Sequence, residues 1–343
     1  MKRHILMIST GGTIASAPSG NGLSPQITSD QMLASIAGAI ENCQVDTLQI
    51  MNIDSVNIQP EHWLLLAKTI RENYARFDGF VITHGTDTMS YTAAALCYLI
   101  QNPDKPVVLT GAQVPLEDPL SDAKKNLIDS IRFAAESGAR GVFIVFSGAV
   151  IIGTRAKKLK TKSFDAFASI NFPEYAIVEG RRILRFPVRY IEGLPTRFFY
   201  NLCPDVFLLK LTPGLDPGIL EYLGKRYRAI VIECYGVGGL PFLDRRSFLD
   251  EIGKIDPKDC LVVMATQAML EGSDALLYEV GKNAVMKYGM LQSYDMTVEA
   301  VMTKLMWLLG RGLSTEEIKK AFYEPVAQDI LLQPEAETPQ SIK

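Results

Sequence analysis

Six short apolar runs recur along this chain of 343 residues, and each is nearly continuous rather than alternating with polar positions. The runs are rich in valine and isoleucine. This pattern is typical of parallel strands that are buried on both faces of a sheet. It predicts strands within residues 4–10, 79–85, 106–112, 141–148, 229–236 and 260–267.

Helical patterns with recognisable ends lie between these runs. Three cap-type residues open the segment at 28–30, and Pro60 is of a type favoured in the first turn of a helix. Ser314 and Glu317 have the spacing of a capping box. The patterns predict helices over residues 28–42, 60–77, 89–102, 297–312 and 314–322.

Strands that alternate with helices indicate an α/β fold with a mainly parallel sheet flanked by helices. The proline-rich stretch 184–218 shows little periodicity, which is typical of a connection between domains. We expect a larger N-terminal α/β domain over residues 1–188, a linker over 189–212 and a smaller C-terminal α/β domain over 213–343.

The composition excludes several classes of function. Hydrophobic residues make up 48% of the chain and charged residues 21%, as in ordinary soluble globular proteins. The net charge of −3 does not favour nucleic acid or an anionic membrane as a partner. No apolar run is long enough to span a bilayer, and the first one is too short for a signal peptide. We therefore expect no nucleic-acid partner and no membrane partner.

The cysteines and histidines indicate neither a disulfide framework nor a metal site. The five cysteines are odd in number and scattered without CxxC spacing, which is typical of free thiols in a reducing compartment. The three histidines stand at no ligand spacing, and we interpret His84 as a structural residue. We predict a cytoplasmic protein without a metal or other cofactor.

Two of the predicted strands end in turns rich in glycine and threonine. The turns read TGGTIAS, residues 10–16, and HGTDTMSYTA, residues 84–93. Ligands of open α/β sheets bind beyond the carboxyl ends of the strands, and the second turn leads into a helix whose N-terminus favours an anionic group. Neither turn has the spacing of a phosphate-binding loop. Taken singly, each is explained by an ordinary turn or helix cap.

Together the two turns resemble the two signature stretches of the bacterial-type L-asparaginases, most closely the cytoplasmic, type I branch. The resemblance covers nearly the whole chain and includes IDSVNIQPEHWLLLAK, VLTGAQVPL, SDAKKNL, FDAFASINFPE, YGVGGLP and DMTVEAVMTKL. It implies an enzyme that hydrolyses L-asparagine to L-aspartate and ammonia without a cofactor. It also implies a homodimer or a homotetramer, with the catalytic residues in the N-terminal domain.

The resemblance implies the catalytic residues as well. Thr13 matches the nucleophilic threonine of the family, which forms an isoaspartyl ester in place of a direct attack by water. Thr86 and Asp87 match two members of the family's Thr-Asp-Lys set. Counting back from the FDAF segment, the lysine matches Lys158. Its neighbours, which a slightly shifted alignment would choose, are Lys157 and Lys160.

Substrate recognition is implied in the same way. Asp87 resembles the family's ligand for the substrate ammonium, and Ser55 with nearby backbone groups would bind the α-carboxylate. The oxyanion of a tetrahedral intermediate needs preorganised N–H groups, for which the backbone of Thr86 and of Ala112 are candidates. The expected substrate-binding residues are Gly12, Asp54, Ser55, Val56, Thr86, Asp87 and Ala112.

One departure from the family pattern concerns the proton of the nucleophile. Many members carry a tyrosine on the lid after the first signature, hydrogen-bonded to the nucleophile, where this chain has Leu23. The group that accepts the proton of Thr13 is then either on a neighbouring subunit or the pair formed by Thr86 and Lys158.

Two further departures concern the branch and its regulation. Val56 stands where the periplasmic branch has glutamine, which agrees with type I. Some type I members are activated by asparagine at a second site that uses an arginine and a cysteine. This chain has Glu233 and Ala268 at those places, so we expect no such activation.

Two alternatives from other classes share this resemblance. The ammonia-generating subunit of archaeal tRNA-dependent amidotransferases is similar but carries an extra domain ahead of the first signature, which here begins at residue 10. A non-catalytic amino-acid sensor on the same fold would not need the nucleophile Thr13. Release of ammonia from asparagine separates these alternatives.

Overall fold

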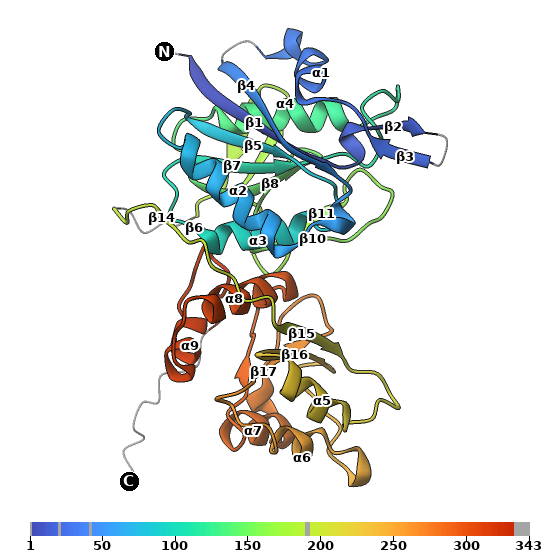
Figure 1. Ribbon diagram of the computed structural model, residues 1–343, viewed down its shortest axis with the longest axis vertical. Helices are drawn as coiled ribbons and strands as arrows, with labels where there is room; N and C mark the ends of the chain where they lie inside the picture. The colour runs from blue at the N-terminus through green and yellow to red at the C-terminus, as the bar shows by residue number, and fades with distance from the viewer. Residues whose placement is uncertain (1, 20–21, 41–42, 189–192, 333–343) are drawn as a thin grey trace. The chain divides into compact units, whose positions relative to one another are not determined.

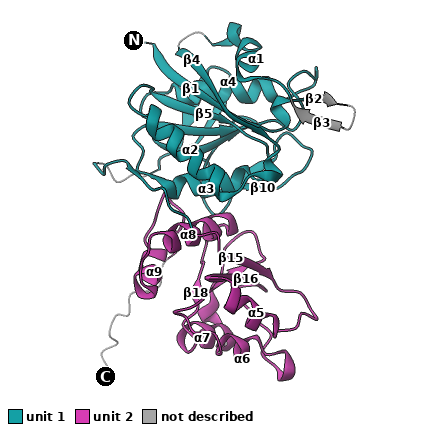
Figure 2. Cartoon of the chain, in the orientation of Figure 1, with its two compact units in different colours: residues 1–202 teal, residues 203–343 magenta. Residues whose placement is uncertain are grey.

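The computed structural model describes residues 2–19, 22–40, 43–188 and 193–332, without the side chains of residues 17–25 (Figure 1). The chain forms two compact units, residues 1–202 and 203–343 (Figure 2). The division falls inside the stretch 189–212 that was expected to be a linker. Within that stretch, residues 206–210 form a strand of the second unit, because the apolar run VFLLK follows Pro204 and Asp205.

An eight-stranded sheet forms the centre of the first unit. Its strands are β1 (Arg3–Gly11), β4 (Cys43–Ile53), β5 (Gly79–Thr83), β7 (Pro106–Thr110), β8 (Gly141–Phe146), β9 (Ala149–Ile152), β12 (Ala176–Glu179) and β13 (Arg182–Arg185). The order is β13-β12-β9-β8-β7-β5-β1-β4. The pairs from β8 to β4 are parallel, whereas β9, β12 and β13 join antiparallel. The sheet is therefore mixed and mostly parallel, and the carboxyl ends of β1, β4, β5 and β7 lie at one edge.

Strand β4 was not among the predicted strands. It runs parallel to β1, from the pair Arg3 and Cys43 to the pair Ser9 and Gln49, at the edge of the sheet. Its residues are partly buried or exposed. An edge strand with one wet side can carry polar residues, so it lacks the continuous apolar run that identified the central strands.

Helices cover both faces of this sheet (Figure 1). One face is covered by α1 (Ser29–Ala34) and α4 (Ala123–Ala134), the other by α2 (Pro60–Asn73) and α3 (Met89–Leu99). Thr28 caps α1 through a capping box with Gln31, and Pro60 is the first residue of α2. The helix expected over residues 28–42 is shorter than predicted, since α1 ends before a 3₁₀ turn at Ala37–Ala39 and residues 41–42 lie outside the described part. The glycine in that turn disfavours a continued helix.

Short hairpins and paired segments surround the sheet. These are β2 (Ser16–Ser19) with β3 (Gly22–Pro25), β6 (Ile100–Gln101) with β14 (Arg197–Phe198), and β10 (Ala156–Lys158) with β11 (Phe167–Ser169). The β10–β11 hairpin carries Lys158, one of the expected site residues.

The second unit contains a smaller, parallel sheet. Its strands are β15 (Val206–Lys210), β16 (Ala229–Cys234), β17 (Leu261–Thr266) and β18 (Leu291–Gln292). Its helices are α5 (Ile219–Arg226), α6 (Phe248–Ile252), α7 (Glu279–Met286), α8 (Val298–Gly310) and α9 (Thr315–Phe322). The capping box of Ser314 and Glu317 at the start of α9 is confirmed. Within the described part of the chain, every helix is too short or too polar to cross a bilayer.

Candidate active site

Glycine turns bring the ends of β1, β5 and β7 into direct backbone contact. A Cβ atom added to Gly12 would lie 2.4 Å from the backbone nitrogen of Gly85, and one added to Gly111 would lie 2.3 Å from the carbonyl oxygen of His84. Gly12 also has a φ of 83°, which favours glycine. The two threonine turns, far apart along the chain, are thus packed on each other, and Thr13 and Thr86 each follow one of the touching glycines.

Hydrogen bonds between buried hydroxyls fix the strands just before these turns. The Ser9 and Thr83 hydroxyls lie 3.0 Å apart, and the Thr10 hydroxyl donates to the Thr83 carbonyl oxygen at 2.8 Å. The N–H of Gly12 donates to the carbonyl oxygen of Ile53 at 3.0 Å. Small hydroxyl residues at the ends of these strands therefore hold the turns in register, in addition to any chemical role.

Thr13 begins a single 3₁₀ turn, η1 (Thr13–Ala15), directly after Gly12. The residue is half-buried, while Ile14 and Ala15 are buried. The hairpin β2–β3 follows at once. The side chain of Leu23, expected to replace the lid tyrosine of the family, lies outside the described residues.

Lys158 contacts two residues of the second turn, Thr86 and Asp87. Its Nζ lies 2.7 Å from Thr86 Oγ1 and 2.7 Å from Asp87 Oδ1. Thr86 is buried, whereas the Asp87 side chain is 57% exposed and that of Lys158 is 16% exposed. This leaves the carboxylate open to a ligand while the ammonium is held inside against the threonine.

The β10–β11 hairpin decides which lysine occupies this place. Lys158 pairs with Phe167 and Lys157 with Ala168, so the two lysines point to opposite faces of the hairpin. Lys160 lies beyond the strand and forms an ion pair with Asp165. Of the three neighbouring lysines, the structure places Lys158 next to Thr86 and Asp87.

The segment after β4 reaches the same edge of the sheet. The short turn η3 (Ser55–Asn57) is capped by Asp54, whose carboxylate accepts from the N–H of Val56 at 3.2 Å. Ser55 is buried, and its Oγ would lie 2.6 Å from a Cβ on Gly85. The Val56 side chain is exposed. Among Asp54, Ser55 and Val56, it is Ser55 whose side chain packs against the second turn, at Gly85.

His84 is a buried part of the turn. Its Nδ1 donates to the Gly85 carbonyl oxygen at 2.7 Å, and its Nε2 then accepts from the Thr92 hydroxyl at 3.0 Å. The indole N–H of Trp63 donates to that same hydroxyl at 3.0 Å. Burial lowers the pKa of His84 to about 4, so the ring is neutral near pH 7. These contacts hold the turn in shape.

The backbone at Thr86 and Ala112 offers N–H groups at this edge. Ala112 is buried and directly follows Gly111, which packs on His84. Among the residues that the structure describes, no acceptor binds the N–H of Thr86 or of Ala112. N–H groups that bind no other described part of the chain are available to stabilise an oxyanion.

Sequence reasoning did not single out Gln113, which follows Ala112. Its side chain accepts the Thr86 hydroxyl at 3.2 Å and also reaches the loop of the β10–β11 hairpin. Glutamine in a loop carries no signal in the sequence that distinguishes this role from ordinary solvent exposure.

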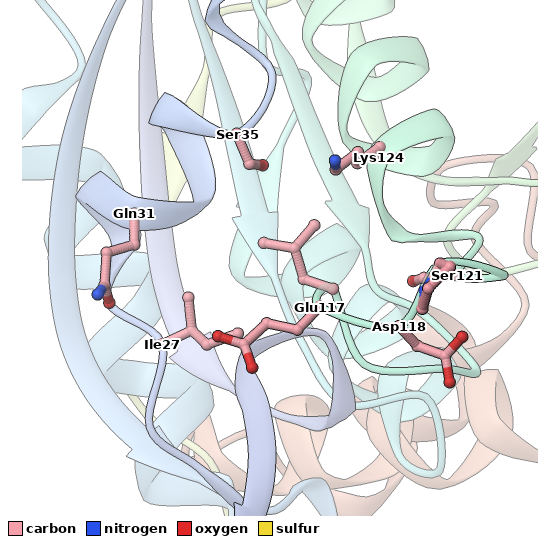
Figure 3. Close-up of a pocket in the computed structure, with 9 residues that line it drawn as sticks. Ile27, Gln31, Ser35, Glu117, Asp118, Ser121 and Lys124 are labelled. Atoms are coloured by element: carbon pink, nitrogen blue, oxygen red, sulfur yellow. The ribbon is translucent and has the colours of Figure 1, made fainter.

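A cavity of about 330 Å³ lies near α1 and the start of α4 (Figure 3). Its walls are Ile27, Gln31, Ser35, Leu116, Glu117, Asp118, Pro119, Ser121 and Lys124. None of the predicted site residues lines it, so it is separate from the cluster around Lys158. In the described part of the chain, no three His, Cys, Asp or Glu residues group as metal ligands would.

Two family models match this chain. Residues 4–187 match the model described as Asparaginase, N-terminal, and residues 205–322 match the Glutaminase/Asparaginase C-terminal domain. The two matches together span most of both compact units.

Individual relatives agree with these matches. The L-asparaginase of Thermococcus kodakarensis is 40% identical over 329 residues, which cover 95% of this chain and 98% of that protein. A solved structure of the thermostable L-asparaginase from Thermococcus kodakarensis superimposes with a TM-score of 0.91 at 38% identity, covering 96% of this chain and 100% of that one. L-asparaginase 1 of Escherichia coli K12 is 34% identical and covers 93% of this chain and 96% of that protein. A subunit of the glutamyl-tRNA(Gln) amidotransferase of Methanosphaera stadtmanae is 33% identical, and the match covers 92% of this chain but 74% of that protein.

Proposed function

This chain belongs to the asparaginase family and is an L-asparagine amidohydrolase, and we propose that it works through a threonine ester formed on Thr13. The observation that carries the assignment of the site is the contact of Lys158 with both Thr86 and Asp87. This contact lies where the two glycine–threonine turns pack on each other, at Gly12 just before Thr13 and Gly85 just before Thr86.

The proposed reaction has two steps. The Thr13 oxygen attacks the side-chain amide carbon of asparagine, the C–O bond forms, and the C–N bond then breaks. The hydroxyl proton passes from Thr13 to the leaving nitrogen, which departs as ammonia. Thr86 accepts a hydrogen bond from the attacking Thr13 hydroxyl, and the Lys158 ammonium beside Thr86 stabilises the negative charge that develops on the Thr13 oxygen. Water then attacks the ester carbon, releases L-aspartate and returns the proton to Thr13.

Charge complementarity supports the proposed substrate contacts. The exposed side of the Asp87 carboxylate would bind the substrate ammonium, while Lys158 neutralises its other side at 2.7 Å. Ser55 and the backbone of Gly12 and 54–56 would bind the α-carboxylate. The N–H groups of Thr86 and Ala112 would stabilise the oxyanion of the tetrahedral intermediate.

We also propose a cytoplasmic homodimer or homotetramer. The described residues include all five cysteines, and none of these forms a disulfide. Burial raises the pKa of the Cys260 thiol to about 12, so this group stays protonated and unreactive at neutral pH. Whether the chain forms a homodimer or a homotetramer is measured directly by gel filtration with light scattering.

The purified chain alone should release ammonia from L-asparagine, and from L-glutamine more slowly. All the groups that the proposed reaction uses belong to this chain, which supports activity without a partner protein. A coupled ammonia assay, run with and without glutamyl-tRNA and amidotransferase partner proteins, makes the measurement. Activity that appears only with those additions would favour the amidotransferase alternative, and binding of asparagine without any turnover would favour the sensor.

Initial rates should depend hyperbolically on asparagine concentration, with a Hill coefficient of about 1. Glu233 lies in β16, and Ala268 follows the end of the neighbouring strand β17. A carboxylate at this place repels the carboxylate of an asparagine effector, and alanine offers it no polar contact. A clearly sigmoidal curve that Glu233→Ala leaves sigmoidal would show that another site couples to catalysis.

A further inference from the structure

Gln113 connects two segments that the proposed mechanism needs in contact. Its Oε1 accepts the hydroxyl of Thr86, at 3.2 Å. Its Nε2 donates to the carbonyl oxygens of Lys160 and Ser163, at 3.4 Å and 3.2 Å. Both carbonyls belong to the loop that follows Lys158 in the β10–β11 hairpin. One side chain therefore joins the Thr86 turn to the segment that carries the catalytic lysine.

The contacts settle which end of the amide faces Thr86. Two carbonyl oxygens can only accept, so the group that faces Lys160 and Ser163 must be the donor, Nε2. A flipped amide would place its oxygen against both of them. The oxygen therefore faces Thr86 and accepts the hydrogen bond from its hydroxyl.

This arrangement also fixes the direction of the Thr86 hydroxyl. The Lys158 ammonium can only donate, so it occupies one lone pair of Thr86 Oγ1. The hydroxyl proton is directed to Gln113. The remaining lone pair is left for one further group, toward which Thr86 acts as an acceptor rather than as a donor.

Gln113 is itself held by a buried network. The Asp122 carboxylate accepts from the backbone N–H of Gln113 at 3.0 Å and of Val114 at 3.2 Å. Asn126 donates to Asp122 at 3.0 Å and to the carbonyl oxygen of Gly111 at 3.0 Å. Asp122 and Asn126 are both buried. The backbone that positions the amide is therefore held by buried hydrogen bonds on both sides of Ala112.

We propose that Gln113 is a positioning residue for the amidohydrolase reaction: it keeps Thr86 in contact with Lys158 and turns the Thr86 hydroxyl so that its free lone pair faces the nucleophile. The inference rests on the proposed roles of Thr86 and Lys158. It predicts an effect on the rate of the chemical step and little effect on substrate binding, since neither Asp87 nor Ser55 forms a hydrogen bond with Gln113 among the residues that the structure describes.

The test is Gln113→Met, which keeps the length of the side chain and removes both the acceptor and the donors. We expect kcat for asparagine to fall about 10- to 100-fold, because small misplacements of catalytic groups have effects of this size. KM should change less than about threefold and the melting temperature little. Gln113→Glu keeps the acceptor and should retain more of kcat than Gln113→Met. The matched control Gln49→Met, at an exposed position of β4, should keep the wild-type kcat and KM.

A double-mutant cycle separates positioning from a general structural effect. In a Thr86→Val background there is no hydroxyl to direct, so adding Gln113→Met should lower the residual rate less than about twofold. A full additional loss there, or a KM that rises in parallel with the loss of kcat, would assign Gln113 a merely structural role and overturn the inference. An unchanged kcat in Gln113→Met would overturn it as well. Absence of asparaginase activity in the wild-type chain would instead contradict the proposed function.

Discussion

A Thr13→Ala variant is expected to hydrolyse L-asparagine roughly 10³-fold more slowly than the wild-type chain, or slower still. Alanine removes the hydroxyl that forms the ester, and water is left to attack the amide directly. The remaining groups that would bind the substrate are unaffected, so KM should change little. Steady-state ammonia release, with the wild-type chain and Thr13→Ser measured in parallel, gives the values.

Thr13→Ser is the informative control for this variant. It keeps a hydroxyl on the same 3₁₀ turn after Gly12, so it should retain a measurable fraction of the rate. Acid-quenched reactions of the wild-type chain should contain an ester on the peptide that includes Thr13, by mass spectrometry. An alanine variant that keeps a tenth of the wild-type rate would mean that another group is the nucleophile.

A Lys158→Met variant is expected to lose activity on the same scale, about 10³-fold in kcat. Methionine fills a similar volume but leaves the buried Thr86 hydroxyl without the ammonium that lies 2.7 Å away. It also leaves Asp87 without the charge that neutralises one of its oxygens. Rates, and circular dichroism to show that the variant is folded, check this expectation.

Lys157→Met is the matched control, since the same change is made one residue away. Lys157 points to the opposite face of β10, so its loss should change kcat less than about threefold. The reverse outcome, an inactive Lys157→Met and a nearly wild-type Lys158→Met, would shift the catalytic assignment by one residue. Combining Thr13→Ala with Lys158→Met should reduce the rate far less than the product of the single effects, because the two groups act in one step.

Much of the fold could be predicted from local patterns alone. All six predicted strands are present, because a strand buried on both faces requires an unbroken apolar run. The capping box of Ser314 and Glu317 was readable because both partners lie within one turn of helix. Four strands of the larger sheet, β4, β9, β12 and β13, were not predicted. For β4 the reason is its position at the edge of the sheet, which relaxes the demand for apolar residues.

For the candidate site, too, local sequence determined some features and the tertiary structure decided the others. The sequence by itself determined the two glycine–threonine turns, because a close approach of two backbones requires glycine at a particular position. The resemblance to the asparaginases implied the roles of Thr13, Thr86 and Asp87. The resemblance implied Lys158 but left its neighbours close by, and only the tertiary structure shows that Lys158 rather than Lys157 contacts Thr86, since side chains alternate across a strand and the pairing of β10 with β11 sets the face. Only the tertiary structure revealed Gln113, because its three partners lie 27, 47 and 50 residues away along the chain. Local periodicity indicates which side chains of a segment face the core. It does not indicate which distant segment a polar side chain will contact once the chain has folded.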